Sequence, residues 1–389
     1  MNASPKPRDR AQLVWPAAGI AITIFAVELI AANPFYSPHI PLMIGIAVWG
    51  AALVLVLMLS AHRAGARIGV LLAGLFLAVP CFVRTPPLFC GLLMCAMIMP
   101  FAAASALALG PPIAGFRARL AYLCSWCGTR QINRRAKDFD VVLLMQLIAA
   151  TVVLAAGIAV VMAVPDSGFW LPVRWLAGGI MALAFAEMAT ACFPLVATAL
   201  GVTVPPLMLS PWRSASVGEF WTKRWNIFAS EKVFRPFCFG PLARRGIGLA
   251  LFAAFALSAV GHMLLAFITL GRWRISMICG AFFLVQPLLI IIERRLGVRR
   301  WRLAAARTWT LAALAVTSPL FVEPMLQVIE RSWGAQDSVL LATGSVLGFV
   351  IGFSSLVSLA SLASCPPTAN PIPVLSSLPH QIKNPPGVN

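Results

Sequence analysis

The chain has 389 residues, of which 60% are hydrophobic and only 11% are charged, and its mean hydropathy is +0.89. Soluble domains carry about 25% charged residues, so this composition excludes a soluble globular protein and indicates a polytopic membrane protein. The formal net charge of +18 comes from basic residues gathered between apolar runs. That placement indicates cytoplasmic loops that face anionic lipid headgroups or a polyanionic substrate, and it does not indicate nucleic-acid binding.

Long apolar stretches divide the chain into candidate membrane spans, because a spanning helix needs about 20 apolar residues. The candidates are residues 11–33, 41–61, 66–83, 86–109, 141–164, 170–200, 247–270, 275–293, 303–322 and 338–363. The predicted fold class is therefore an all-α bundle of about ten transmembrane helices. We expect residues 1–363 to form a single integral membrane domain and the Pro/Ser/Asn-rich tail, 364–389, to be disordered.

The loops between the spans alternate in charge, which predicts their orientation. Basic connections are the N-terminus and residues 62–67, 117–137, 213–245 and 294–302, whereas the alternate connections are short or acidic. Both termini are therefore predicted to be cytoplasmic, in a bacterial inner membrane or the endoplasmic reticulum. The exceptions to this pattern are Arg84, Arg174, Arg272 and Arg274.

The cysteines do not predict a metal site. Five of the nine fall in apolar runs, and Cys124 and Cys127 have C-x-x-C spacing in a basic loop. A zinc site needs two further ligands at matching spacing, and none is nearby, so we expect free thiols.

Few ionisable residues fall within the spans, and each costs about 2.5–3.5 kcal/mol at membrane depth. They are Glu28, Glu187 and His262, with Glu293 at a helix end. The helical face around His262 carries small and hydroxyl-bearing residues, which leaves room beside the imidazole. Its residues are Phe255, Ser258, Ala259, Leu265, Ala266 and Thr269. This pattern suits a functional or a structural histidine, whereas a structural pairing is favoured for Glu28 and Glu187.

A basic, aromatic segment precedes the helix that carries His262. Ser216 and Glu219 have the spacing of a capping box, which predicts a helix that begins near Val217 and ends near Pro236. Its apolar arc is typical of a helix lying at the headgroup boundary or packed on protein. Because Arg224 falls within that arc, its guanidinium must either snorkel or meet a buried partner.

The combination of this segment with an intramembrane histidine resembles the wax synthase branch of the membrane-bound O-acyltransferases. The matching motif is Glu219-Phe220-Trp221-x-x-Arg224-Trp225-Asn226, followed by Gly261-His262. Two flanking pieces agree with it, Ser210-Pro211-Trp212-Arg213-Ser214 and Thr317-Ser318-Pro319-Leu320-Phe321-Val322-Glu323-Pro324. The resemblance covers about residues 203–330. Many family members carry an acidic residue directly after the histidine, whereas this chain carries Met263 at that position.

The resemblance implies a bundle with an internal chamber, and acyl transfer from acyl-coenzyme A to the hydroxyl of an apolar alcohol. The acyl group is long-chain or acetyl, and the acceptor is a fatty alcohol, a sterol or terpenoid, or a secondary metabolite. By position, His262 is the catalytic base and Asn226 its partner. Acyl-coenzyme A is a co-substrate, and neither a cofactor nor a metal is implied. The expected donor-binding residues are Trp221, Lys223, Arg224, Trp225 and Arg235.

Two other functions remain open at this point. A proton-coupled transporter or channel would use Glu28, Glu187 and His262 as a path. The sequence opposes it, because paired Gly/Pro-broken helices in two matching halves are missing. O-acetylation of an extracytoplasmic glycan would need a larger outward site than the short outer loops offer. The oligomeric state is left open.

Overall fold

The computed structural model describes residues 139–204, 206–227, 229–239, 242–332 and 339–364, together with short pieces and single residues between 47 and 134. Most of the four predicted spans before residue 110, and the tail beyond Ser364, lie outside the described residues, as do Glu28, Cys124 and Cys127.

Long apolar helices dominate the described chain, as the sequence predicts. They are α6 (Val141–Ala163), α7 (Leu171–Ala199), α10 (Ile247–Leu270), α11 (Trp273–Arg295) and α14 (Val339–Ser364). By length and composition, four helices of the described part can cross a membrane, and a fifth span is formed if one bent pair crosses as a unit. The helical class is confirmed, and the total of about ten spans stays a prediction.

The only strand pairing among the described residues is one short antiparallel contact. It joins β1 (Asn133–Arg134) to β2 (Val202–Thr203), with Asn133 opposite Thr203.

The predicted span over residues 303–322 contains a helix break that the sequence analysis does not predict. A single residue, Ser318, separates α12 (Leu303–Thr317) from α13 (Pro319–Ser332), and the two helices are bent by 52° relative to each other. Proline has no backbone N–H to donate and its ring clashes with the preceding turn, so Pro319 can start a helix but not continue one.

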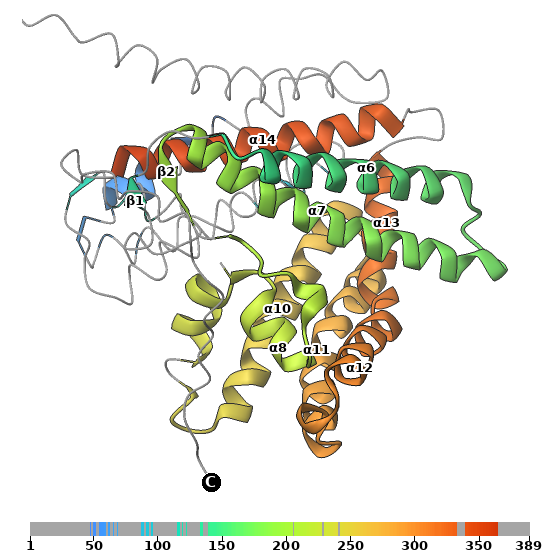
Figure 1. Ribbon diagram of the computed structural model, residues 1–389. Helices are drawn as coiled ribbons and strands as arrows, with labels where there is room; N and C mark the ends of the chain where they lie inside the picture. The colour runs from blue at the N-terminus through green and yellow to red at the C-terminus, as the bar shows by residue number, and fades with distance from the viewer. Residues whose placement is uncertain are drawn as a thin grey trace, which may run out of the picture.

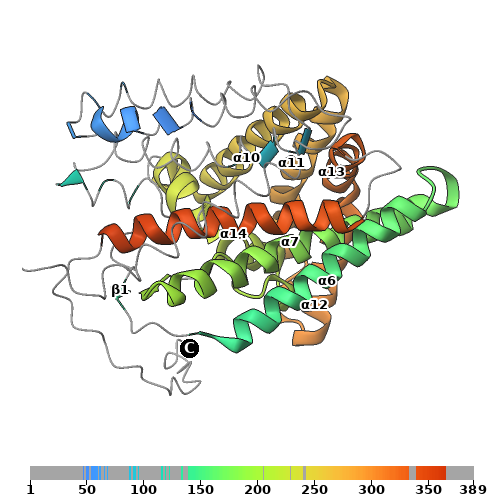
Figure 2. The same cartoon turned by 90° about the horizontal axis from the view of Figure 1, so that it is seen from above.

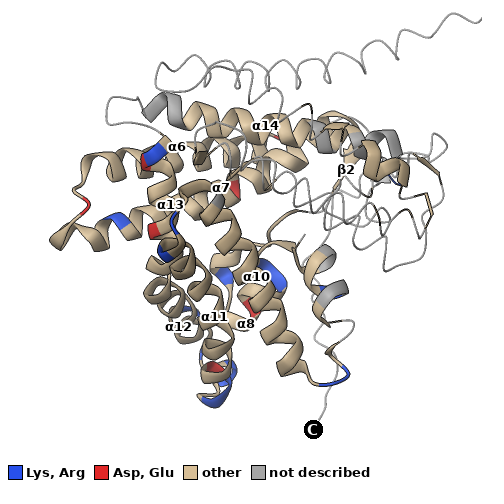
Figure 3. Cartoon of the chain, turned by 180° about the vertical axis from the view of Figure 1, so that it is seen from behind, with Lys and Arg blue, Asp and Glu red and all other residues tan. Residues whose placement is uncertain are grey.

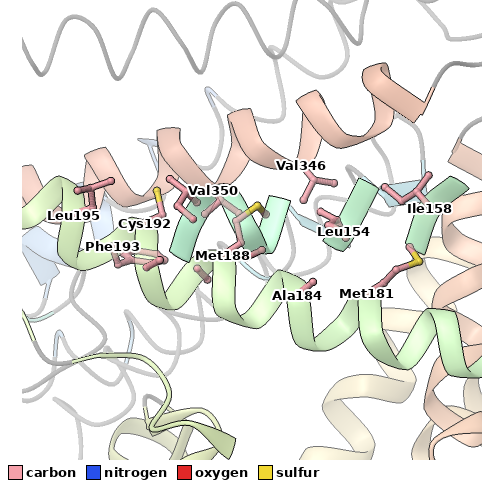
Figure 4. Close-up of a cluster of buried hydrophobic side chains, with 14 of the residues drawn as sticks. Leu154, Ile158, Met181, Ala184, Met188, Cys192, Phe193, Leu195, Val346 and Val350 are labelled. Carbon is pink, nitrogen blue, oxygen red and sulfur yellow. The ribbon is translucent and has the colours of Figure 1, made fainter. Parts of the chain in front are cut away.

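The described helices form two packed groups (Figure 1). Helices α6, α7 and α14 run side by side in one group, α10, α11 and α12 form the other, and α13 lies between them; Figure 2 shows the first group from above. The core of the first group is apolar, and Figure 4 shows Met181, Met188 and Cys192 of α7 between side chains of α6 and α14. Val322 and Leu326 of α13 join the same core, which connects it to the second group.

Two charged side chains of the first group, Glu187 and Arg174, have hydrogen-bond partners. The Gln146 side-chain amide donates to Glu187 at 2.7 Å, which supports the structural role predicted for Glu187. The buried Arg174 donates to the carbonyl oxygens of Val161 and Val164 and forms an ion pair with Glu330 of α13. Arginine is rarely buried in a protein unless it is paired in this way.

Helices α10 and α11 approach closely at one glycine. A Cβ atom added to Gly280 would lie 2.4 Å from Cγ of Met263, so the methionine side chain occupies the space that the glycine leaves. Met263 is the residue that directly follows His262. The position directly after the histidine is thus used here for helix packing.

Candidate active site

The motif segment begins with the predicted helix cap. The Ser216 hydroxyl accepts from the Glu219 N–H at 2.9 Å, and the Glu219 carboxylate reaches back to the Ala215 N–H at 2.9 Å. The helix therefore begins at Val217, as the capping box predicts.

The helix is much shorter than predicted. Helix α8 (Val217–Glu219) passes directly into a π-helical turn, η5 (Phe220–Arg224), which closes when the Trp225 N–H donates to the Phe220 carbonyl at 2.8 Å. Asn226 then adopts a left-handed conformation with φ of 46°, and a second π-helical segment, η6, runs over Ala229–Phe239. The continuous helix from Val217 to the vicinity of Pro236 was therefore a wrong prediction, because asparagine tolerates the left-handed conformation that ends the first helix.

Arg224 meets a partner within the motif. Its Nε donates to Glu219 at 2.6 Å and one of its Nη atoms donates to the Leu209 carbonyl at 3.0 Å. Burial raises the pKa of Glu219, but the Ala215 N–H and the charge of Arg224 outweigh it and bring the pKa below its usual value. The two side chains therefore close the motif turn as an ion pair, and this accounts for a guanidinium within the apolar arc.

Trp221, within the apolar arc, packs on protein. Trp221 lies edge-on to Phe255 of α10 at 5.7 Å and to Phe282 of α11 at 6.0 Å, and its ring centroid lies 6.0 Å from that of Phe283. Phe321 of α13 lies 5.5 Å from Phe282. These five rings and the imidazole of His262 are called the aromatic cluster below.

His262 belongs to this cluster. Its imidazole stacks on Phe283 with centroids 4.0 Å apart and meets Phe321 edge-on at 5.9 Å. The ring is thus directed toward α11 and α13, and Phe283 lies between it and Trp221 of the motif. The helix of the histidine and the motif segment, which are separate in the sequence, are brought into one cluster.

The hydrogen bond of His262 fixes which ring nitrogen is basic. Nδ1 lies 2.8 Å from the Ser258 carbonyl oxygen, one turn earlier on α10, and 3.5 Å from the Ser258 hydroxyl. A carbonyl oxygen can only accept, so this contact assigns the proton of the neutral imidazole to Nδ1. Nε2 then carries the lone pair, and it is the nitrogen that can remove a proton.

Asn226 caps the next helical segment. Its side-chain oxygen accepts from the Ala229 N–H at 3.0 Å, and its backbone oxygen accepts from the Ser230 N–H at 3.2 Å. This cap uses only the side-chain oxygen of Asn226, as an acceptor. The amide NH₂, which is the donor group of the side chain, can therefore still donate to a ligand. Among the described residues, no hydrogen bond or ring contact joins Asn226 to His262.

The other residues expected to bind the donor differ in their surroundings. Lys223 is exposed beside the motif, and Arg235 is exposed on η6. Trp225 stacks on Phe220 at 5.3 Å and lies 6.2 Å from Trp221. The structure thus brings Trp221, Lys223, Arg224 and Trp225 together on one turn, while Arg235 lies on the following segment.

Two polar residues of α11 hold the motif, and the sequence alone gave them no role. The Glu293 carboxylate is 2% exposed and accepts from the Val217 N–H at 2.6 Å and the Gly218 N–H at 3.0 Å. Gln286 is fully buried; it accepts from the Trp221 indole N–H at 3.0 Å and donates to Thr317 of α12 at 3.3 Å. The two lie two turns apart, so one face of α11 holds both α8 and the early part of η5.

A signal for these two residues was present in the sequence. Gln286 and Glu293 interrupt an apolar run at a spacing that places them on the same helical face as Phe283 and Ile290. A polar residue buried in a span needs a partner, so this spacing predicts that another segment docks there.

Two proteins of Arabidopsis thaliana are similar to this chain. "Probable long-chain-alcohol O-fatty-acyltransferase 3" is 28% identical over 155 residues, which cover 35% of this chain and 45% of the relative. "Probable long-chain-alcohol O-fatty-acyltransferase 2" is 26% identical over 140 residues, which cover 33% of this chain and 39% of the relative. The chain therefore matches less than half the length of these curated relatives. No protein-family model matches the chain.

Proposed function

Because the chain is similar to the wax synthase-like O-acyltransferases, as its motifs predicted, we propose that it transfers an acyl group from acyl-coenzyme A to an apolar alcohol. The observation that carries this proposal is the state of His262. Its Nδ1 is held by the Ser258 carbonyl and its ring is stacked in the aromatic cluster, so Nε2 is the group that acts as a base.

In the proposed reaction, Nε2 of His262 removes the hydroxyl proton as the alcohol oxygen attacks the thioester carbonyl. The new C–O bond forms, the C–S bond breaks, and the imidazolium returns the proton to the departing thiolate. The products are an ester and free coenzyme A, with no net proton released. A positioned base of this kind contributes about 10²–10⁴-fold to the rate.

The remaining site residues are assigned to binding. The exposed cations Lys223 and Arg235 attract the phosphate groups of the donor, and Trp221 and Trp225 supply apolar surface for its arm. Arg224 shapes the motif through Glu219 and presents its remaining N–H groups. A thioester is already an activated acyl donor, so the transfer needs no resident cofactor. Lipid-soluble acceptors reach the aromatic cluster through the predicted chamber.

The direct test is the release of free thiol from acyl-coenzyme A. Membranes that contain the protein are supplied with palmitoyl- or acetyl-coenzyme A and a long-chain alcohol, and the ester is identified by mass spectrometry. We expect thiol release that depends on the alcohol and matches the ester formed mole for mole. Thiol release without ester would indicate a hydrolase, and no release above membranes lacking the protein, with either donor and a panel of alcohols, would contradict the proposal.

Asn226 is proposed to stabilise the negative oxygen that forms when the thioester carbonyl is attacked. Removing one such donor costs about 2.7–4 kcal/mol where it has been measured, so we expect Asn226→Ala to lower the rate constant of transfer at least about tenfold. Asn226→Asp is the matched variant, since it keeps an oxygen to cap Ala229 but loses the NH₂ donor. If both variants lower the rate constant of transfer equally, the donor role is supported. A normal rate constant for Asn226→Asp would contradict that role and leave Asn226 as a helix cap only.

A further inference from the structure

Five arginines crowd the turn that joins α11 to α12. They lie within residues 294–302, here called the arginine turn, and are Arg294, Arg295, Arg299, Arg300 and Arg302. Figure 3 shows basic residues gathered at this end of α11 and α12. All five side chains are exposed, and within the described chain none of them forms an ion pair. The positive-inside bias accounts for the sign of this charge but not for its density.

The turn is a built structure. Gly297 adopts a left-handed conformation with φ of 64°, and the Arg300 N–H donates to its carbonyl at 2.8 Å. Val298 is fully buried and anchors the short helix η7 (Val298–Arg300). The carboxylate of Glu293 feels the charges of Arg294 and Arg299, but it is buried and already accepts two backbone N–H groups. Glu293 therefore leaves most of the charge on this turn unbalanced.

Three of the arginines lie where a cation is unfavourable within the protein itself. Arg299, Arg300 and Arg302 precede the first turn of α12, and this turn contains no acidic residue. The N-terminal end of a helix carries a partial positive charge, so cations next to it repel it. Arg302, at the N-cap, makes no capping hydrogen bond with its side chain. Folding alone gives no reason for these residues, which indicates a partner that is negatively charged.

Apolar side chains alternate with the arginines on the same turn. Leu296 is 49% exposed, Trp301 is 40% exposed and Leu303 is 56% exposed. Trp301 also lies edge-on to Trp309 at 6.1 Å, which fixes its ring. Arginine, tryptophan and leucine together are typical of a segment at the bilayer interface, where apolar groups enter the acyl region and guanidinium groups meet headgroups. A soluble polyanion would give no reason for the exposed leucines.

We propose that the arginine turn binds the phosphate groups of anionic phospholipids in the cytoplasmic leaflet. Guanidinium groups bind phosphate oxygens through paired N–H donors, and an anionic membrane surface attracts cations that lie close to it. The turn follows directly after Glu293, which holds the motif segment, so a bound lipid would stabilise the end of α11 that positions the proposed active site.

The test compares lipid binding in two variants of the full-length protein with the same loss of charge. Arg299→Gln/Arg300→Gln alters the arginine turn, and Arg272→Gln/Arg274→Gln alters exposed arginines at the other end of α11, about 35 Å away along the helix. Purified protein in a neutral detergent is titrated with phosphatidylglycerol or phosphatidylcholine, while bound lipid is counted by native mass spectrometry and Tm is recorded.

We expect phosphatidylglycerol, but not phosphatidylcholine, to bind and to raise Tm. The concentration for half-saturation should increase roughly thirtyfold in Arg299→Gln/Arg300→Gln, as about 1 kcal/mol per cation implies, and less than twofold in the control variant. Equal losses in both variants would mean diffuse charge attraction and would overturn the site. Displacement of the lipid by free coenzyme A at equimolar concentration would also overturn it, in favour of a soluble phosphate ligand. Neither readout requires acyltransferase activity, so this result is independent of the proposed reaction.

Discussion

Replacing His262 with alanine is expected to lower the rate constant of acyl transfer by about 10²–10⁴-fold while the protein still inserts and folds. Within the described chain, the side chain makes hydrogen bonds only with Ser258 of its own helix, and two ring contacts. Its loss removes the base but little of the packing, since α10 meets α11 mainly through neighbouring apolar residues. The measurement is thiol release at saturating alcohol and donor, normalised to folded protein.

Two further variants make the His262 result specific. His262→Gln keeps a polar side chain of similar reach but cannot accept a proton at neutral pH, so its rate should be as low as that of alanine. His62→Ala removes an exposed histidine outside the aromatic cluster and should leave the rate unchanged. A wild-type rate in His262→Gln would eliminate the role of base, because packing and polarity would then suffice.

Glu293→Ala is the second change for which we expect a large effect. It would leave the buried N–H groups of Val217 and Gly218 without an acceptor, at about 1–3 kcal/mol each. The motif turn would lose its anchor on α11, so we expect both a lower Tm and a loss of acyl transfer per folded molecule. Thermal unfolding of the purified protein and thiol release measure the two effects separately.

The control for Glu293 is Glu187, a second carboxylate within a span. Glu187 accepts from Gln146 in the α6–α7 group, away from the motif, so Glu187→Ala should lower Tm without changing the rate per folded molecule. Glu293→Gln keeps one acceptor oxygen and should lie between the wild type and alanine. If Glu293→Ala and Glu187→Ala affected Tm and rate in the same proportions, the positioning role of Glu293 would be wrong.

The sequence predicts the parts of this fold that depend on local physics. Long apolar runs predict the long helices α6, α7, α10, α11 and α14 to within a few residues, because hydrophobic length is the main requirement for a span. The cap at Ser216 is likewise a local signal, since its partner lies three residues away. The small residues around His262 indicate room beside the imidazole, and in the structure the ring of Phe283 stacks on it at 4.0 Å.

The remaining features depend on contacts that no local pattern contains. The apolar periodicity from Val217 to Phe228 continues through the break at Asn226, so it predicts one helix where the chain forms a π-helical turn and a left-handed residue. The anchors on α11 join residues 65 to 76 positions apart. Such pairings follow from how α11 packs against the motif, and the sequence only marks the buried polar residues that require them.

The bond between His262 and Ser258 has a consequence for how a site of this kind arises. Its acceptor is a main-chain atom one turn away, so any side chain at position 258 leaves that atom in place. A backbone atom of the same helix therefore orients the imidazole, and this contact requires no residue from a distant segment. No neighbouring acid has to be recruited for the purpose, and position 263 is free to carry the thioether that fits against Gly280.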